Sequence, residues 1–239
     1  MKLLRARAVL FDLDNTLFDH VTSARAGVEA VLDHTGCENT TQLQTVWLDL
    51  EREYFQQYLD GRLSFQGQRR ARIRGLFRSA GLPVPSDDAV LDGLFAVHGE
   101  AARAAWAAFP DAVAALGRLR DAGLETGILT NGNHNQQIDK LSVTGLDQYV
   151  DHMFVSGRTG HAKPASEAFL LACEAMGRQP GEVIHVGDDP VADIFGARRA
   201  GLQAVLLDRA GRTASGTVCS LNDLKVLLPQ QKGPPVVAG

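Results

Sequence analysis

The stretch Ala8-Val9-Leu10-Phe11-Asp12-Leu13-Asp14-Asn15-Thr16 joins an apolar run to two aspartates and a threonine. Its first part is a continuous apolar run, which predicts a strand over residues 8–13 that is buried on both faces, as in a parallel sheet. Because side chains alternate along a strand, we expect Asp12 and Asp14 to project from the same side at its carboxyl end. Ligands bind at this end of the strands in open parallel sheets. The stretch therefore predicts a parallel sheet together with the position of its functional site.

Two carboxylates this close repel each other, so Asp12 and Asp14 require a cation between them or a proton on one of them. Mg²⁺ prefers oxygen ligands of this kind. A carboxylate can also attack phosphorus and form an aspartyl-phosphate. Taken alone, the pattern Asp-x-Asp-x-Thr, which ends at Thr16, also fits a turn with solvated acids and a capping threonine. The rest of the sequence decides between these interpretations.

The sequence after residue 109 alternates short apolar runs with helical patterns, which is typical of β-α units and a parallel sheet. Strands are predicted over residues 125–129, 152–155, 182–186 and 204–207. Helices are predicted over residues 112–121, 136–143, 166–176 and 191–200, and several of them are followed by a glycine that can end a helix. The predicted fold class is α/β.

A helical insertion separates the first strand from these units. It is about ninety residues long, contains no strand pattern and shows about four helical patterns. Spacings of three and four residues separate Leu43, Trp47, Leu50, Tyr54 and Tyr58, which predicts a helix with one apolar stripe. We predict an α/β core over residues 1–17 and 109–229, an α-helical bundle over 18–108 and a flexible tail over 230–239.

Further polar residues follow three of the later strands. Thr130 and Asn131 stand at a strand-to-helix junction, where a hydroxyl and backbone N–H groups can bind phosphate. Lys163 is one of five lysines and can hold a phosphate beside clustered carboxylates. Each signal has an ordinary alternative when taken singly: a common turn for Thr-Asn-Gly, and a solvated side chain for the lysine.

The last cluster is acidic. Asp188, Asp189 and Asp193 lie within six positions after an apolar strand, which is electrostatically costly unless a metal or Lys163 compensates the charge. For Asp193 alone, the alternative is a surface carboxylate at a helix N-terminus. With Asp12 and Asp14 at another strand end, we favour a metal site.

These residues resemble the haloacid dehalogenase superfamily in the order Asp12-x-Asp14-x-Thr16, Thr130, Lys163 and Gly187-Asp188-Asp189-x-x-x-Asp193. The resemblance spans the whole chain except the tail. It implies a Rossmann-like parallel-sheet core with the first strand at its centre. It also implies a mobile helical cap inserted just after the first motif, which matches the helical stretch over residues 18–108.

The resemblance further implies roles for these residues. Asp12 would be the nucleophile, and Asp14 would protonate the leaving oxygen and later activate water. Mg²⁺ would be held by Asp12, the backbone carbonyl of Asp14 and Asp188. The phosphate-binding residues would be Thr130, Asn131 and Lys163, and the supporting residues would be Thr16, Asp189 and Asp193.

Membership of this superfamily leaves the reaction open, because fold and function separate. Hydrolysis of a phosphate ester needs a proton for the leaving alkoxide, which Asp14 can supply, whereas displacement of a halide needs no such acid. We expect a Mg²⁺-dependent phosphatase that hydrolyses a small soluble phosphomonoester, such as a nucleoside monophosphate or a sugar phosphate. The alternatives are a phosphosugar mutase, a 2-haloacid dehalogenase-type hydrolase and a non-catalytic phosphate- or partner-binding protein. Residues 130–141 and 156–164 look most like the nucleotidase and N-acylneuraminate-9-phosphatase branch.

Composition and charge exclude several other classes. The chain has 239 residues, 45% of them hydrophobic and 22% charged, as in soluble globular proteins. A net charge of −4 gives no electrostatic reason to expect a nucleic-acid polymer as partner. No apolar run reaches the ~18 residues of a membrane span, and no export signal is recognisable. Three scattered cysteines indicate neither disulfides nor a thiolate metal site. We expect a cytoplasmic monomer or homodimer.

Two arginines in the helical insertion are candidates for substrate specificity. On a helical wheel with Phe65 at 0°, Leu76 and Ile73 fall at about 20° and 80° and define an apolar arc with Phe65. Arg69, at about 40°, lies within this arc and Arg72, at about −20°, lies at its edge. A guanidinium there is costly unless it reaches water, a carboxylate or an anion. Either arginine could contact a second polar or anionic group of the substrate. The alternative is snorkelling, or an ion pair with an acid of the insertion such as Glu51 or Glu53.

Overall fold

The computed structural model describes residues 4–211 and 217–227. It divides into two compact units: a core unit of Met1–Phe18 and Ala108–Gly239, and a cap unit of Asp19–Ala107. The predicted boundaries stood at residues 17/18 and 108/109. The predicted tail over residues 230–239 lies outside the described residues.

The core unit contains a six-stranded parallel sheet with the order β4-β3-β2-β5-β6-β7. Its central strand β2 pairs with β3 on one side and with β5 on the other, so that Phe11 stands opposite both Ile128 and Val186. The strands are β2 (Ala8–Phe11), β3 (Glu125–Thr130), β4 (His152–Val155), β5 (Val183–Gly187), β6 (Gln203–Leu207) and β7 (Thr217–Val218). A separate short pair joins β1 (Leu4–Arg5) to β8 (Val226–Leu227).

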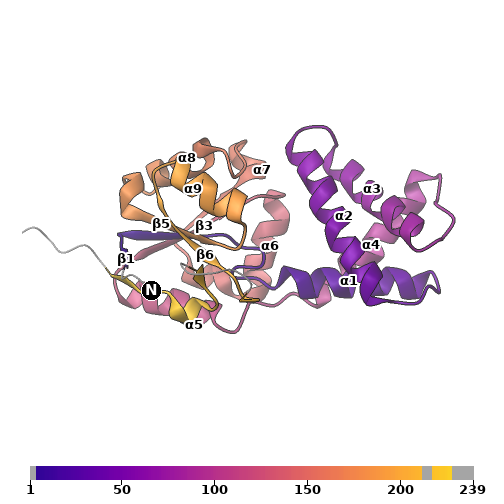
Figure 1. The fold of residues 1–239 in the computed structure, drawn as a ribbon, viewed down its shortest axis with the longest axis horizontal. Helices are drawn as coiled ribbons and strands as arrows, with labels where there is room; N and C mark the ends of the chain where they lie inside the picture. Colours follow the sequence, from indigo (N-terminus) through magenta and orange to yellow (C-terminus); the bar gives the residue numbers. More distant parts are fainter. Residues whose placement is uncertain (1–3, 212–216, 228–239) are drawn as a thin grey trace, which may run out of the picture. The chain divides into compact units, whose positions relative to one another are not determined.

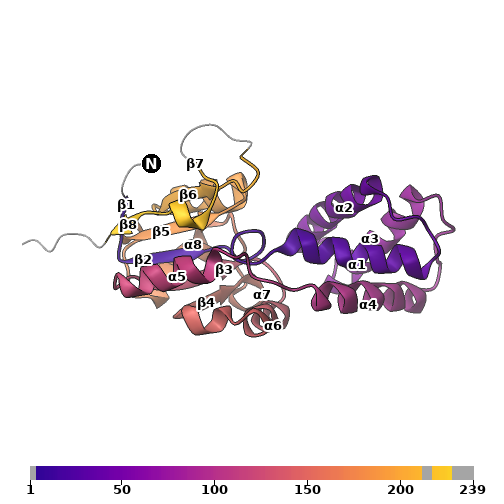
Figure 2. The ribbon, with the colours of Figure 1, turned by 90° about the horizontal axis from the view of Figure 1, so that it is seen from below.

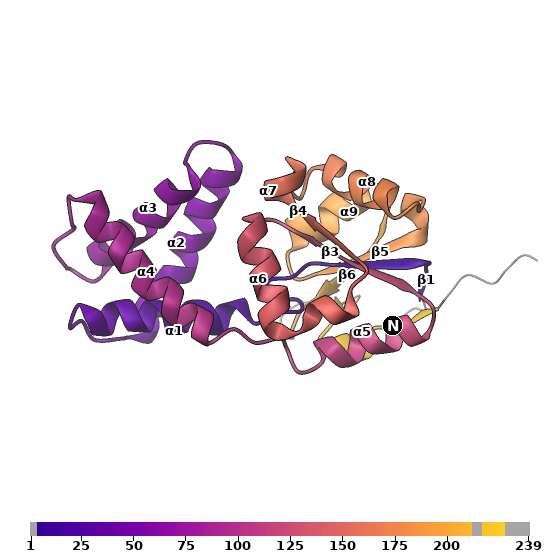
Figure 3. The ribbon, with the colours of Figure 1, turned by 180° about the vertical axis from the view of Figure 1, so that it is seen from behind.

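Helices cover both faces of this sheet. The helices α8 and α9 lie on one face and α5 lies on the other (Figures 1 and 3). The helices of the core unit are α5 (Ala112–Asp121), α6 (His134–Thr144), α7 (Ser156–Thr159), α8 (Ser166–Ala175) and α9 (Gly196–Arg199). Short helical turns occur at Leu146–Tyr149, Pro180–Glu182 and Leu221–Asp223, and a π-helical turn occurs at Pro190–Phe195. The predicted α/β class and Rossmann-like parallel sheet are therefore confirmed.

The apolar run Ala8–Phe11 is fully buried. All four residues of β2 have no exposed surface, because neighbouring strands and helices on both faces enclose them. Ala8 and Leu10 pack with Phe169 of α8 in one apolar cluster. Transfer of such side chains out of water, worth about 25 cal/mol per Å², stabilises the sheet and fixes the position of its central strand.

The predicted range of the first strand is too long, because the strand ends at Phe11 and not at Leu13. The chain turns directly after Asp12, because the carbonyl of Leu13 accepts hydrogen bonds from the backbone N–H groups of Leu17 and Phe18. Asn15 adopts a left-handed conformation in this turn, with φ of 63°. Asparagine tolerates this conformation better than most residues do.

The cap unit is a four-helix bundle with its own apolar core, as the helical patterns predicted. Trp47, Ile73 and Leu91 are fully buried in it. Close packing of α2 against α3 depends on Gly75, because a Cβ there would lie 2.6 Å from Cδ2 of Leu50. Figure 2 shows α1 and α4 side by side. The helices are α1 (His20–His34), α2 (Thr41–Leu59), α3 (Phe65–Ser79) and α4 (Asp88–Ala104).

Within residues 4–211 and 217–227, no helix is both long and apolar enough to cross a bilayer.

Candidate active site

Three adjacent parallel strands bring the predicted site residues to one edge of the sheet. Asp12 follows β2, Thr130 ends β3, and Asp188 follows β5. The register is fixed by the hydrogen bond from the backbone N–H of Asp12 to the carbonyl of Val186, at 2.8 Å. Because these strands run in the same direction, their carboxyl ends lie together, which is where open parallel sheets bind ligands.

Lys163 joins the first and last motifs. Its ammonium lies 2.6 Å from Oδ1 of Asp12 and 2.6 Å from Oδ1 of Asp193, and its side chain is 3% exposed. Burial lowers the pKa of Lys163, but the two carboxylates outweigh this effect and keep it above its ordinary value. Lys163 is therefore a fixed positive charge beside Asp12.

The environment of Asp12 disfavours its charged form. Burial raises the pKa of Asp12 well above its ordinary value, Lys163 opposes this rise, and the carboxylates of Asp193 and Asp188 add to it. Burial, followed by Asp193, likewise raises the pKa of Asp188 to about 7. One lysine thus does not compensate the three acids, and a further cation would relieve their repulsion.

The carboxylates of Asp12, Asp188 and Asp193 offer oxygen atoms within 4.8 Å of one another. Hard divalent cations such as Mg²⁺ take oxygen ligands of this kind, so the donor set fits that metal. The carboxylate oxygens of Asp193 already accept hydrogen bonds from Lys163, His185 and the backbone N–H of Asp189, which leaves them less free to bind a metal. Asp12 and Asp188 are accordingly better placed to hold a metal directly.

Asp193 is enclosed by the protein. His185, which is fully buried in β5, lies with Nε2 2.9 Å from Oδ1 of Asp193. Burial lowers the pKa of His185. Because the carboxylate of Asp193 only accepts hydrogen bonds, Nε2 of His185 is the donor. Gly187 makes room for the carboxylate, because a Cβ there would lie 2.2 Å from Cγ of Asp193. Asp189 caps the turn that carries Asp193 and accepts hydrogen bonds from the backbone N–H groups of Val191 and Ala192.

Asp14 faces a different set of partners. Its Oδ1 lies 2.5 Å from Nζ of Lys140, and its Oδ2 accepts a hydrogen bond of 3.0 Å from Nε2 of Gln137. The same Gln137 amide lies 2.9 Å from Oγ1 of Thr130. The structure therefore links Asp14 to Thr130 through α6, and links Asp12 to Asp193 through Lys163.

Asn131 holds the segment that carries Lys163. Its side chain accepts a hydrogen bond from the backbone N–H of Lys163 at 2.8 Å and donates one to the Lys163 carbonyl at 2.9 Å. Thr16 is fully buried, and its hydroxyl has no hydrogen-bond partner within residues 4–211 and 217–227. Its carbonyl accepts a hydrogen bond from Arg209.

The two candidate arginines of the cap unit differ. Arg72 is 5% exposed and donates a hydrogen bond of 2.8 Å to Oε1 of Glu51, which is the ion pair named as the alternative. Arg69 is half-buried, with its guanidinium 4.1 Å from the ring centroid of Phe65 and 4.9 Å from that of Phe95. Burial lowers the pKa of Arg69, and Arg72 lowers it further.

Sequence reasoning did not identify Lys140, Gln137 and His185 as site residues. Gln137 and Lys140 are about one helical turn apart on α6, which begins close to Thr130. This spacing could have indicated that both side chains lie on one helix face near the site. His185 carried a weaker signal, because a histidine inside an apolar strand needs a polar partner.

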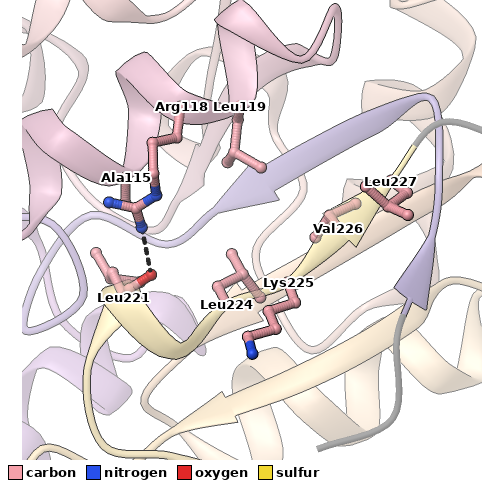
Figure 4. A pocket seen from close by; sticks show the side chains of 8 residues that line it. All are labelled: Ala115, Arg118, Leu119, Leu221, Leu224, Lys225, Val226 and Leu227. Carbon is pink, nitrogen blue, oxygen red and sulfur yellow. Dashed lines mark hydrogen bonds between the residues drawn. The ribbon is translucent and has the colours of Figure 1, made fainter.

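A groove of about 290 Å³ lies elsewhere in the core unit, between α5 and the segment that ends in β8 (Figure 4). Arg118 and Lys225 contribute its charged groups, and none of its lining residues is an acid. It therefore offers no carboxylate for metal binding or nucleophilic attack.

Comparison with known proteins identifies the family. Residues 6–201 match the family described as haloacid dehalogenase-like hydrolase. The chain is 34% identical over 221 residues to ribulose-1,5-bisphosphate 5-phosphatase of Halopiger xanaduensis, covering 85% of each chain. It is 29% identical over 223 residues to N-acylneuraminate-9-phosphatase of Mus musculus, covering 89% of this chain and 86% of that one. The magnesium-bound putative HAD-hydrolase YfnB of Bacillus subtilis has a similar fold, with a TM-score of 0.75, 21% identity and coverage of 91% and 96%. The chain belongs to the haloacid dehalogenase-like hydrolase family.

Proposed function

We propose that this protein is a Mg²⁺-dependent phosphatase that hydrolyses a small phosphomonoester through an aspartyl-phosphate on Asp12. The observation that carries the proposal is the contact of Lys163 with Asp12, at 2.6 Å, beside the carboxylates of Asp188 and Asp193. A nucleophile, a fixed cation and a set of metal-binding oxygens at one strand edge suit attack on a phosphoryl group.

In the first step, a carboxylate oxygen of Asp12 attacks phosphorus and the bond from phosphorus to the leaving oxygen breaks. Asp14 gives its proton to that oxygen. In the second step, Asp14 takes a proton from water, the water oxygen attacks phosphorus, and the bond to Asp12 breaks. Asp14 thus acts first as an acid and then as a base. General acid–base catalysis of this kind typically raises the rate by about 10²- to 10⁴-fold.

Mg²⁺ would be held by the side chains of Asp12 and Asp188 and by the backbone carbonyl of Asp14. When bound, it supplies positive charge that offsets the repulsion between the phosphate and the clustered carboxylates. Asp193 and Asp189 support this arrangement, since Asp193 anchors Lys163 and Asp189 caps the turn beneath it.

The phosphate would be bound by Lys163, Thr130 and Asn131. Lys163 offers a buried ammonium, which is needed beside so many acids. The side chain of Asn131 is engaged with the backbone of Lys163, so its contribution to phosphate binding is to place the lysine. Thr16 supports the turn after Asp12 with its buried side chain.

The proposed substrate is a phosphorylated small metabolite, with a sugar phosphate favoured over a nucleoside monophosphate. This preference rests on the relatives reported above, whose names refer to a phosphorylated pentulose and to a phosphorylated acylneuraminate. In the cap unit, Arg69 remains the candidate for selecting a polar or anionic group of the substrate, because Arg72 is already paired with Glu51.

The experiment is a release assay for inorganic phosphate across sugar phosphates, nucleoside monophosphates and p-nitrophenyl phosphate, with and without Mg²⁺. The proposal expects release with Mg²⁺, none in excess chelator and none from Asp12→Asn. Conversion of a sugar phosphate to its isomer without phosphate release would instead identify a mutase. Folded protein that binds phosphate esters and turns none over would identify a binding protein.

A further inference from the structure

A second lysine lies buried beside the site. The whole Lys140 residue is 3% exposed, and its ammonium lies 2.5 Å from Oδ1 of Asp14. The same ammonium lies 4.8 Å from the ring centroid of Phe18. A buried ammonium is strongly disfavoured unless a carboxylate compensates it. Lys140 and Asp14, which are 126 residues apart in the sequence, therefore form a specific pair.

Gln137 holds the other oxygen of the same carboxylate. It is 2% exposed, and its Nε2 lies 3.0 Å from Oδ2 of Asp14. Gln137 and Lys140 are three residues apart on α6 and so lie on one helix face. Because each carboxylate oxygen has its own donor, rotation of the Asp14 side chain breaks at least one of the two contacts. The plane of the carboxylate is thereby fixed.

The exposures of the pair show which of the two groups meets solvent. The side chain of Asp14 is 27% exposed, whereas that of Lys140 is 4% exposed. The lysine lies behind the carboxylate and leaves part of Asp14 open. A residue so placed acts on a reacting group through Asp14 and has little surface with which to contact the substrate itself.

We propose that Lys140 and Gln137 are positioning residues that hold Asp14 for proton transfer to the leaving oxygen. This inference rests on the proposed function, in which Asp14 is the acid. Misplacement of a catalytic group by about 1 Å can lower a rate about 10²-fold. Loss of Lys140 should therefore act on the step that needs the proton, and only through Asp14.

The experiment is a double-mutant cycle with two substrates that share the phosphoryl group and differ in the leaving group. The variants are Lys140→Met, Asp14→Asn and the double variant, assayed with an alkyl phosphate and with p-nitrophenyl phosphate at saturating Mg²⁺. We expect Lys140→Met to lower kcat for the alkyl phosphate by about 10- to 100-fold and that for the aryl phosphate by less than about 3-fold, since p-nitrophenolate leaves without protonation. In the Asp14→Asn background, the same substitution should change kcat by less than about 2-fold.

Further variants distinguish loss of the position of Asp14 from a general loss of protein stability, and two of them, Gln136→Leu and Lys225→Met, are matched controls. Gln137→Leu should lower kcat for the alkyl phosphate more than for the aryl phosphate, with a smaller shared loss because its amide also contacts Oγ1 of Thr130. Gln136→Leu, an exposed neighbour on the same helix, should leave both rates unchanged. Lys225→Met removes an exposed lysine of the core unit and should also be neutral. Lys140→Arg keeps a cationic donor and should recover part of the lost rate. If Lys140→Met does not fold, the rates of Gln137→Leu and Lys140→Arg with the two substrates test the proposal instead.

Three results would overturn the inference. Equal losses on both substrates would make Lys140 a structural or phosphate-binding residue. A further large loss from Lys140→Met in the Asp14→Asn background would show that it acts independently of Asp14. Unchanged rates in every α6 variant would remove the positioning role. Failure of the proposed function looks different, because Asp14→Asn would then show no dependence on the leaving group.

Discussion

The side chain of Asn131 forms two hydrogen bonds with the backbone of one residue, Lys163. It accepts from the Lys163 N–H at 2.8 Å and donates to the Lys163 carbonyl at 2.9 Å. The end of β3 thus holds the segment whose lysine contacts Asp12. An amide side chain satisfies both groups at once, which neither alanine nor aspartate can do.

Replacing Asn131 should lower both stability and activity. Asn131→Ala removes two hydrogen bonds at a partly buried site, which should lower the free energy of unfolding by about 1 to 3 kcal/mol. It should also lower kcat, because Lys163 loses its fixed position. Thermal unfolding and steady-state kinetics measure the two effects. Asn135→Ala, an exposed asparagine on α6, is the control and should change neither; an unaltered Asn131→Ala enzyme would remove the positioning role.

Gly187 should not tolerate a side chain. A Cβ there would lie 2.2 Å from Cγ of Asp193, so Gly187→Ala must displace the carboxylate that anchors Lys163. We expect a loss of activity of at least about 10² together with reduced stability. Gly181→Ala is the matched control, because no atom lies within 4 Å of a Cβ at that position. Comparable activity in the two variants would contradict the packing described for Asp193.

Replacement of Arg72 should mainly lower the stability of the cap unit, whereas replacement of Arg69 should mainly change substrate specificity. Arg72→Met leaves Glu51 without its guanidinium partner and should destabilise the cap by on the order of 3 kcal/mol. Arg69→Met removes stacking on Phe65 and Phe95, and should lower stability less. If Arg69 selects the substrate, its loss should raise KM for the physiological substrate and leave hydrolysis of p-nitrophenyl phosphate nearly intact. Parallel losses on both substrates would make Arg69 structural.

The cap unit should lose stability in mild acid because of His98. Burial, together with the charge of Arg72, lowers the pKa of His98 to about 3, although Glu51 opposes the shift. In the unfolded chain this histidine binds a proton below about pH 6.5. The unfolded state therefore binds more protons between about pH 6.5 and 3, and stability falls as the pH is lowered through that window.

The expected loss from His98 is about 2 kcal/mol at most between pH 8 and pH 5. The pKa of Glu51 is lowered by Arg72 and His20, although burial opposes them, so its contribution is lost only at lower pH. Both tryptophans, Trp47 and Trp106, lie in the cap unit, so urea unfolding followed by tryptophan fluorescence reports on it. His98→Gln should show a flatter dependence between pH 7 and 5. An equally steep profile in this variant would assign the effect to other groups.

The sequence predicted much of the core, because burial on both faces leaves a clear pattern. The apolar run at Ala8–Phe11 and the acids after it predicted the central strand and the position of Asp12. The three strands β1, β7 and β8 were not predicted, since two residues are too few to show a period. The predicted helix over residues 191–200 is a π-helical turn followed by α9, in which the backbone N–H of Ile194 donates to the carbonyl of Asp189, five residues back.

The contacts of Asp14 could not be derived from local pattern. Lys140 is 126 residues away, and a single sequence carries no sign of which acid a lysine pairs with. His185 and Asp193 are eight residues apart, yet their contact depends on how the turn after β5 folds back. Local periodicity predicts elements and their faces, whereas these contacts depend on the tertiary packing of α6 and of this turn.

Chelation should abolish turnover, and the Mg²⁺ titration should identify the ligands. Asp188→Ala removes one of the two side chains proposed to hold the ion, so it should raise the Mg²⁺ concentration needed for half-maximal rate by at least about tenfold. Asp147→Ala, which removes an acid in the short turn after α6, should leave the titration unchanged. An unaltered titration in Asp188→Ala would move the ligand to another residue.

The proposed mechanism requires a covalent phosphoryl intermediate on Asp12, and rapid quenching of the Asp14→Asn variant detects it. This variant should accept the phosphoryl group of ³²P-labelled p-nitrophenyl phosphate and hydrolyse the intermediate slowly, because no base activates water. We predict a protein-bound label that hydroxylamine releases and that peptide mapping places on Asp12. The label should be absent when Asp12→Asn is added. Continued turnover by Asp14→Asn with no label at Asp12, or with the label on another residue, would contradict the mechanism.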